Sequence, residues 1–204
     1  MEPILRRFGG LAFPMGHSVF ALEVCMRLLP GSPLRRGLHE AVAGYAPGLS
    51  LHQKWQQYSY AAQHLLAELH LAERGCWDYF DEDQKARRDY DMWCNGMLTE
   101  EGARKGPSAS ADPYRSEPRY LTFTMSLLIL HGSPTDRMLA QACNIPQDRL
   151  WHRQTFAHLL RSVGAISFAS VKSDVLYLIP RDEGWGLTAH DLSEKKFEYL
   201  RTVV

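Results

Sequence analysis

The 204-residue chain has no apolar run close to the ~20 residues that a membrane-spanning helix requires. It also has no net charge, because 23 lysine and arginine residues balance 23 aspartate and glutamate residues. A neutral chain has no overall field that attracts nucleic acid or an anionic membrane surface. These absences predict no membrane span and disfavour nucleic-acid binding through net charge, although a local basic patch stays open.

Cysteine is scarce and widely spaced, and no C-x-x-C pair occurs among Cys25, Cys76, Cys94 and Cys143. A zinc site made of four thiolates normally has two close pairs. The spacing therefore predicts buried free thiols in a reducing compartment, which we take to be the cytoplasm.

Motifs that carry chemistry are missing as well. The nine histidines form no H-E-x-x-H pattern, and no nucleophile elbow, phosphate-binding loop or dinucleotide fingerprint is present. The acidic run Asp78–Asp83 lacks the glycine and the distal glutamate of a calcium loop. The sequence thus predicts no catalytic residue, metal or cofactor. An enzyme of unrecognised class stays an alternative, because catalytic residues can assemble from distant positions.

The N-terminal part of the chain reads as helical. Ser18, Ser32-Pro33 and Ser50 each resemble a helix start, and the first of these helices would run to Leu29. The third helix has the clearest pattern, with apolar residues at alternating spacings of four and three along Leu51–Ala72. This stripe fits either a helix docked in its own core or a helix that binds a partner.

A second helix with the same spacing is predicted from about Glu82 to Asn95, with Asp81 as its cap. Proline and small residues then dominate positions 104–118, which is typical of a linker or long loop. The predicted domains are a helical part at 1–103, this linker, and a small α+β domain at 119–204.

Beyond the linker the apolar period changes to two, and Tyr120–Leu130 reads as a strand. Ser133-Pro134 begins a capped helix, and Pro146 opens another that stops at Gly164. Extended segments follow at Ile166–Val171 and Val175–Ile179. The predicted fold class is α+β, mostly helical at first and then a small α/β part with a few strands, without an internal repeat.

One alternative is a winged-helix regulator of nucleic acid formed by residues 136–180. In it, the two extended segments would pair as a wing, and the helix after Pro146 would enter the major groove. This helix would present the following polar residues: Gln147, Arg149, His152, Arg153 and Gln154.

The C-terminal half also resembles a known family. Ala165-Ile166 leads to the run Val175–Ile179, then to Pro180, an acidic loop and Leu187-Thr188 followed by Asp191-Leu192. This order resembles the tail of an uncharacterised domain family with many chloroplast and photosynthetic-membrane members, in which a strand ends in Trp-Thr-Pro. Leu178-Ile179 replaces the Trp-Thr pair here. The resemblance implies a helix packed on a sheet and brings no activity.

By elimination, the sequence favours a non-enzymatic module for protein–protein interaction or assembly, with a protein partner or a second copy of the chain as ligand. The predicted partner-binding residues are the stripe and the neighbouring tryptophans: Leu51, Trp55, Tyr58, Leu65, Leu69, Trp77 and Trp93.

Overall fold

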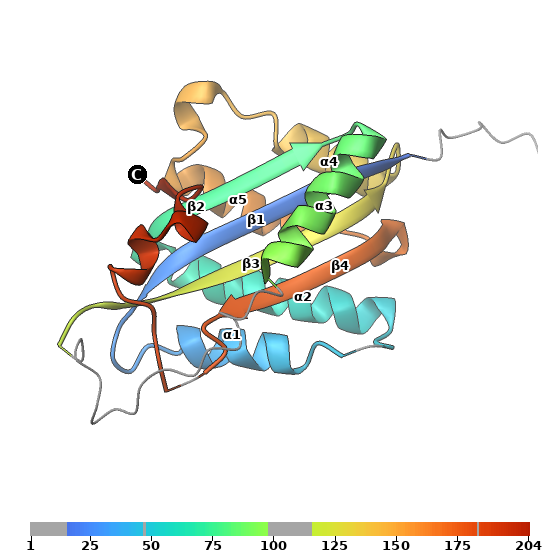
Figure 1. The fold of residues 1–204 in the computed structure, drawn as a ribbon. Helices are drawn as coiled ribbons and strands as arrows, with labels where there is room; N and C mark the ends of the chain where they lie inside the picture. Colours follow the sequence, from blue (N-terminus) through green and yellow to red (C-terminus); the bar gives the residue numbers. More distant parts are fainter. Residues whose placement is uncertain (1–15, 47, 98–115, 183) are drawn as a thin grey trace, which may run out of the picture.

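The computed structural model describes residues 16–46, 48–97, 116–182 and 184–204. Five antiparallel strands form one sheet in the order β4-β3-β1-β2-β5 (Figure 1). The strands are β1 (His17–Leu28), β2 (Ala72–Phe80), β3 (Arg119–Leu130), β4 (Val171–Ile179) and the short β5 (Arg201–Thr202). The central pair, β1 and β3, is in register along twelve residues of each strand.

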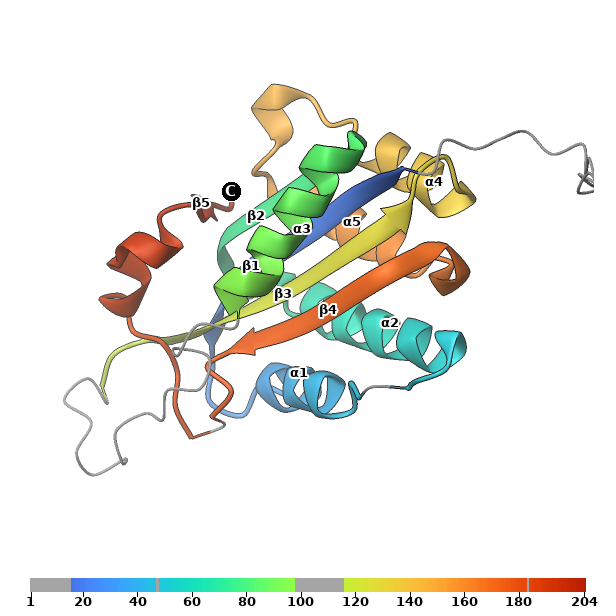
Figure 2. The same cartoon turned by 45° about the vertical axis from the view of Figure 1, so that its right-hand side comes forward.

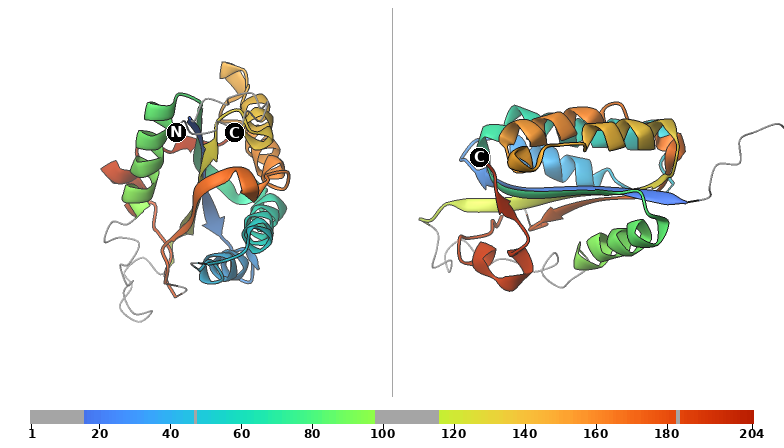
Figure 3. Two further views of the ribbon diagram at one scale, coloured as in Figure 1. Left: turned by 90° about the vertical axis from the view of Figure 1, so that its right-hand side faces the viewer. Right: turned by 90° about the horizontal axis from the view of Figure 1, so that it is seen from above.

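Helices cover the two faces of the sheet unequally. Four helices lie on one face, namely α1 (Leu34–Ala43), α2 (Leu51–Ala67), α4 (Pro134–Ala142) and α5 (Arg153–Val163). The other face carries α3 (Asp83–Met97) and the C-terminal turns that precede β5 (Figure 3). None of the helices in the described part of the chain is both long and apolar enough to cross a membrane.

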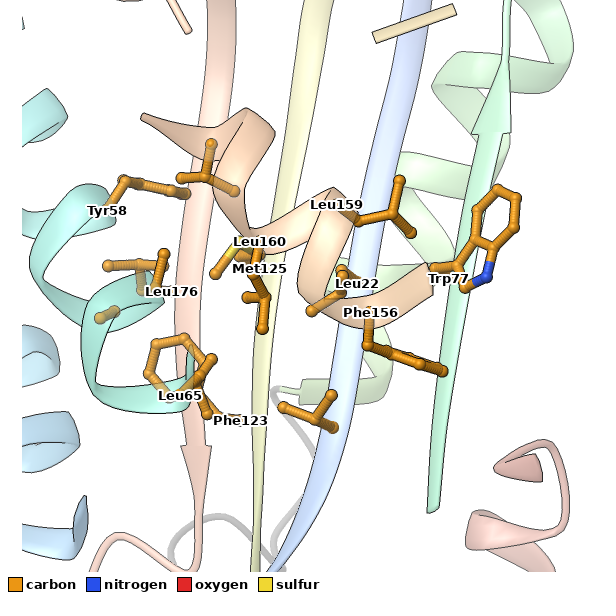
Figure 4. Close-up of a cluster of buried hydrophobic side chains, with 14 of the residues drawn as sticks. Leu22, Tyr58, Leu65, Trp77, Phe123, Met125, Phe156, Leu159, Leu160 and Leu176 are labelled. Carbon is orange, nitrogen blue, oxygen red and sulfur yellow. The ribbon is translucent and has the colours of Figure 1, made fainter. Parts of the chain in front are cut away.

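The main hydrophobic core lies between the sheet and the four-helix layer. Alternate residues of β1, from Phe20 to Met26, point into it, and so do alternate residues of β3, from Leu121 to Ile129. Phe156, Leu159 and Leu160 of α5 pack onto these strands (Figure 4). Two smaller clusters fill the opposite face, one beneath α3 and one beneath the C-terminal turns.

The predicted order of a helical part followed by a small α/β part is wrong. The sheet begins at His17, before any helix, and β1 and β2 come from the region predicted to be helical. The segment predicted as a first helix is the central strand β1, and the Trp77 region is strand β2. Residues before and after the predicted linker therefore belong to one sheet. Positions 104–115 of that linker lie outside the described residues.

The fold is built from two similar halves, which corrects the expectation of no internal repeat. The order β1-α1-α2-β2 recurs as β3-α4-α5-β4, and a 3-10 turn precedes β2 and β4 alike. Both outer strands bulge at their second residue, Glu73 in β2 and Lys172 in β4. Figure 2 shows β1 and β3 side by side between the outer strands.

The sequence repeats the turn that opens each half. Gly31–Leu38 and Gly132–Leu139 share the pattern Gly-Ser-Pro-x-x-Arg-x-Leu. Both glycines have positive φ, 80° and 73°, and the next residue donates its N–H to the carbonyl three positions back at 3.2 Å in each copy. Only glycine adopts this conformation at little cost, so the same turn chemistry serves both halves.

Replacing Gly75 by valine is expected to lower the free energy of unfolding by about 1–3 kcal/mol through overpacking. A Cβ at Gly75 would lie 2.6 Å from Phe156 Cε1 and 3.0 Å from the Glu23 carbonyl oxygen. Urea denaturation measures the loss. Gly164→Ala is the control, because a Cβ there meets no described atom closer than 3.5 Å. Equal stability of both variants would contradict the close approach of α5 to β2.

Candidate functional site

Three adjoining pockets surround the first turns of α5. Their volumes are about 450, 430 and 560 Å³, and the third shares Arg153 with the first and His152 with the second. We call this continuous surface the arginine groove. Its ionisable lining residues are Arg27, His70, Glu73, Arg74, Arg149, His152, Arg153, His158 and Arg161.

Segments far apart in the sequence form the groove. Arg27 stands near the exposed end of β1, Arg74 is the third residue of β2, and Arg153 begins α5. The chain's C-terminal residues hold α5 beside β2, because Val204 donates its N–H to the Trp151 carbonyl and accepts from the Arg153 N–H. Val203 N–H bonds to the Glu73 carbonyl in the same way at 2.9 Å.

The groove is strongly positive although the chain is neutral. Five arginine and three histidine side chains line it against the single acidic side chain of Glu73. Within the described residues, Arg27, Arg149, Arg153 and Arg161 form no ion pair. Some arginines elsewhere have carboxylate partners, as in the pairs Arg36–Glu40, Arg87–Asp83 and Arg88–Asp89.

The corresponding place in the other half carries no such charge. There, Leu51 begins α2, Ser173 is the third residue of β4, and Leu128 occupies the position that Arg27 has in the repeat. Asp174 of β4 is instead buried, and it pairs with Lys54 and accepts from the Tyr45 hydroxyl at 2.7 Å. Since the same fold forms without these arginines, the fold does not require the groove's charge.

The structure disperses the predicted partner-binding residues. Tyr58, Leu65, Leu69 and Trp77 are buried in the chain's own core. Leu51 is exposed, and Trp55 is half-buried with its indole N–H bonded to the Gly164 carbonyl at 2.9 Å.

Trp93 lies on the opposite face of the sheet, edge-on to Tyr199. The stripe therefore forms no continuous exposed surface. Of the predicted partner-binding residues, only Leu69 lines the arginine groove as described.

The two extended segments that were predicted to pair as a wing do not pair with each other. Val171–Ile179 is strand β4 and pairs with β3, whereas Phe168–Ser170 is a 3-10 turn. Residues 166–179 therefore do not project as a hairpin. The polar residues proposed for the second helix are nevertheless exposed, and Arg149, His152, Arg153 and Gln154 line the groove. Arg27, His70, Arg74 and Arg161 were not predicted, because no local motif links them.

Ser18, His131 and Asp136 meet at one end of the sheet without the geometry of a catalytic triad. Ser18 Oγ lies 3.2 Å and Asp136 Oδ2 lies 3.3 Å from the same atom, His131 Nδ1. In a triad the serine and the acid contact opposite ring nitrogens. Ser18 is also fully buried, and Asp136 accepts bonds from Tyr79 and the Gly132 N–H, so the cluster anchors the start of α4.

Glu23 is a buried acid at the centre of the sheet face that carries α3. Its Oε2 accepts from the Tyr199 hydroxyl at 2.7 Å, whereas Oε1 has no hydrogen-bond partner among the described residues. Burial raises the pKa of Glu23, and the hydrogen bond from Tyr199 opposes that rise. No group of three metal-ligating side chains occurs in residues 16–97 and 116–204 as described.

Comparisons of the chain with protein-family models, with curated proteins and with solved structures give no match. The resemblance of the C-terminal half to the uncharacterised family stays a prediction. The arginine groove is thus the candidate functional site on its geometry and charge alone.

Proposed function

We propose that this protein is a non-enzymatic interaction module that binds an acidic segment of a protein partner in the arginine groove. The observation that carries the proposal is the gathering of arginines without carboxylate partners on a concave surface of an otherwise neutral chain. Unpaired guanidinium groups attract carboxylates and steer their approach.

The walls of the groove support a protein ligand. Apolar side chains line the groove together with the charged ones, so a segment that mixes acidic and apolar residues fits both. Arginine is also enriched among the residues that dominate protein–protein binding energy. The apolar lining residues are Leu66, Leu69, Leu71, Ile145, Pro146, Ala157, Val203 and Val204.

The cytoplasm is the compartment we propose for this function. Cys25, Cys76, Cys94 and Cys143 are all free thiols, as is usual for proteins in a reducing compartment. Burial raises the pKa of the Cys143 thiol to about 12 and that of Cys76 to about 12, so both stay protonated and unreactive at neutral pH.

Charge reversal in the groove tests the proposal. A short fluorescein-labelled peptide of alternating glutamate and leucine is expected to bind the native protein at low salt. The double variant Arg153→Glu/Arg161→Glu is expected to bind it at least about tenfold more weakly, because two attractive contacts become repulsive. Fluorescence anisotropy measures the affinity.

The matched control is Lys172→Glu/Lys195→Glu, which makes the same change in net charge at exposed positions outside the groove. Equal losses in both variants would show that only net charge matters. If the native protein binds a mixed-sequence oligonucleotide more tightly than the glutamate–leucine peptide, with a steep salt dependence, the result would favour the nucleic-acid alternative instead.

A further inference from the structure

The pocket between β1, β2 and α5 holds the densest charge of the arginine groove, and we call it the corner pocket. Arg27, Arg74 and Arg153 line it from three different elements, with His70 beside them. Its volume of about 450 Å³ is within the range of small-ligand sites. Thr202 adds a hydroxyl and Glu73 a carboxylate, and the other lining residues, Leu71, Ala72 and Val203, are apolar.

One arginine of the corner pocket is already oriented. Arg74 is half-buried, and its Nη1 donates to the Leu192 carbonyl at 2.8 Å, which fixes the guanidinium plane. A guanidinium held in this way loses little entropy when its remaining donors bind a ligand. Arg27 and Arg153 are exposed, and both line this pocket.

Among the described lining residues of the corner pocket, Glu73 is the one acid. Burial and then the charge of Glu73 raise the pKa of Tyr120. Three arginines and one glutamate leave a formal charge of about +2 before His70 is counted. A single carboxylate needs one guanidinium for a bidentate pair, which leaves two arginines without a partner.

We propose that the corner pocket binds a phosphate monoester group. Such a group carries about −1.5 to −2 charges at neutral pH and three acceptor oxygens, which match three guanidinium groups. The inference rests on the proposed function, in which the group belongs to a phosphorylated side chain within the acidic partner segment. The same chemistry also fits a small phosphorylated molecule, and the experiment separates the two sources.

Isothermal titration of the native protein compares two forms of one peptide, the glutamate–leucine peptide with a central serine and its phosphoserine form. The phosphorylated peptide is expected to bind on the order of tenfold more tightly. Arg27→Gln/Arg153→Gln is expected to abolish this difference. Arg27→Lys/Arg153→Lys is expected to keep part of it, because lysine retains charge without the planar fork.

Arg149→Gln/Arg161→Gln is the matched control, since these residues line the groove outside the corner pocket. It should weaken both peptides by similar factors. Equal binding of the two peptides to the native protein would overturn the phosphate proposal and leave the proposed function standing.

Titration of free O-phosphoserine and inorganic phosphate completes the test. If neither peptide binds but O-phosphoserine does, and binding depends on Arg27 and Arg153, the corner pocket serves a small molecule and the proposed function fails. If no phosphate compound binds, or if binding survives Arg27→Gln/Arg153→Gln with an unchanged melting temperature, the phosphate proposal is wrong.

Discussion

Replacement of Phe156 by alanine is expected to lower the free energy of unfolding by about 3–5 kcal/mol. Phe156 is fully buried and is among the largest side chains with no exposed surface. It projects from α5 onto the sheet beside Leu22 and Trp77 (Figure 4), in the space that Gly75 leaves open. Alanine would leave a cavity that the rigid sheet cannot close, and chemical denaturation followed by tryptophan fluorescence measures the loss.

His158→Ala is the control for this prediction, because His158 is exposed on the same helix. Its effect is expected to stay within about 0.5 kcal/mol. The loss in free energy of unfolding for Phe156→Leu should lie between those for Phe156→Ala and His158→Ala, since leucine keeps most of the buried area. A loss below about 1 kcal/mol for Phe156→Ala would mean that α5 does not pack on β2 as described.

Local signals predicted the structure well wherever a short segment determines its own conformation. Ser50 caps α2 as expected, in a capping box with Gln53, and Ser133 caps α4 by accepting from the Asp136 N–H. The side chains of Thr188 and Asp191 each accept a hydrogen bond from the other's backbone N–H, and 3-10 turns follow them. These features depend on residues only three positions apart.

Strand β1 could not be distinguished from a helix in this way. Both of its faces are covered, so Val19, Ala21 and Cys25 are buried as completely as Phe20 and Leu22. A strand buried on both faces loses its alternation of apolar and polar residues and reads as a continuous apolar run. The serine at its start then resembles a helix cap.

The candidate site depends on contacts that no local pattern encodes. Arg27 and Arg153 line one pocket only because α5 from the second half packs against β2 from the first. The apolar stripe on α2 has a helical period, but the period does not say whether the stripe faces a partner or the chain's own sheet. In the structure Tyr58 and Leu65 face the sheet.

The two similar halves of the fold offer a physical reason why the arginine groove occurs only once. Each half contributes two strands and two helices, and the halves meet at the β1–β3 pair. Packing constrains both copies alike, whereas surface charge is free to differ between them. At the matching position of the repeated turn, Arg35 in one half corresponds to Asp136 in the other. The arginine groove differs between the halves in the same way, because its arginines have no counterpart at the matching positions of the other half.

Replacement of Glu23 by glutamine is expected to stabilise the protein increasingly as pH rises. Burial raises the pKa of Glu23 above its ordinary value of 4.5, so the folded chain binds a proton that the unfolded chain releases more readily. The stabilising effect of that proton is complete below the ordinary pKa and is lost as pH rises through the raised pKa. Glutamine does not titrate, and it keeps an acceptor for the Tyr199 hydroxyl.

Calorimetry of both proteins over a pH series measures this difference. The melting temperatures should be similar in acid and separate toward mildly alkaline pH, where about 1 kcal/mol corresponds to about 2–4 °C for a chain of this size. Burial also raises the pKa of Asp78, to about 6, but Asp78 is present in both proteins, and its effect cancels in the comparison. Tyr199→Phe removes a hydrogen bond that lowers the pKa of Glu23, so its loss of stability should continue to a higher pH than in the native protein. A difference between native and Glu23→Gln proteins that is constant with pH would show that Glu23 titrates alike in the folded and unfolded chains.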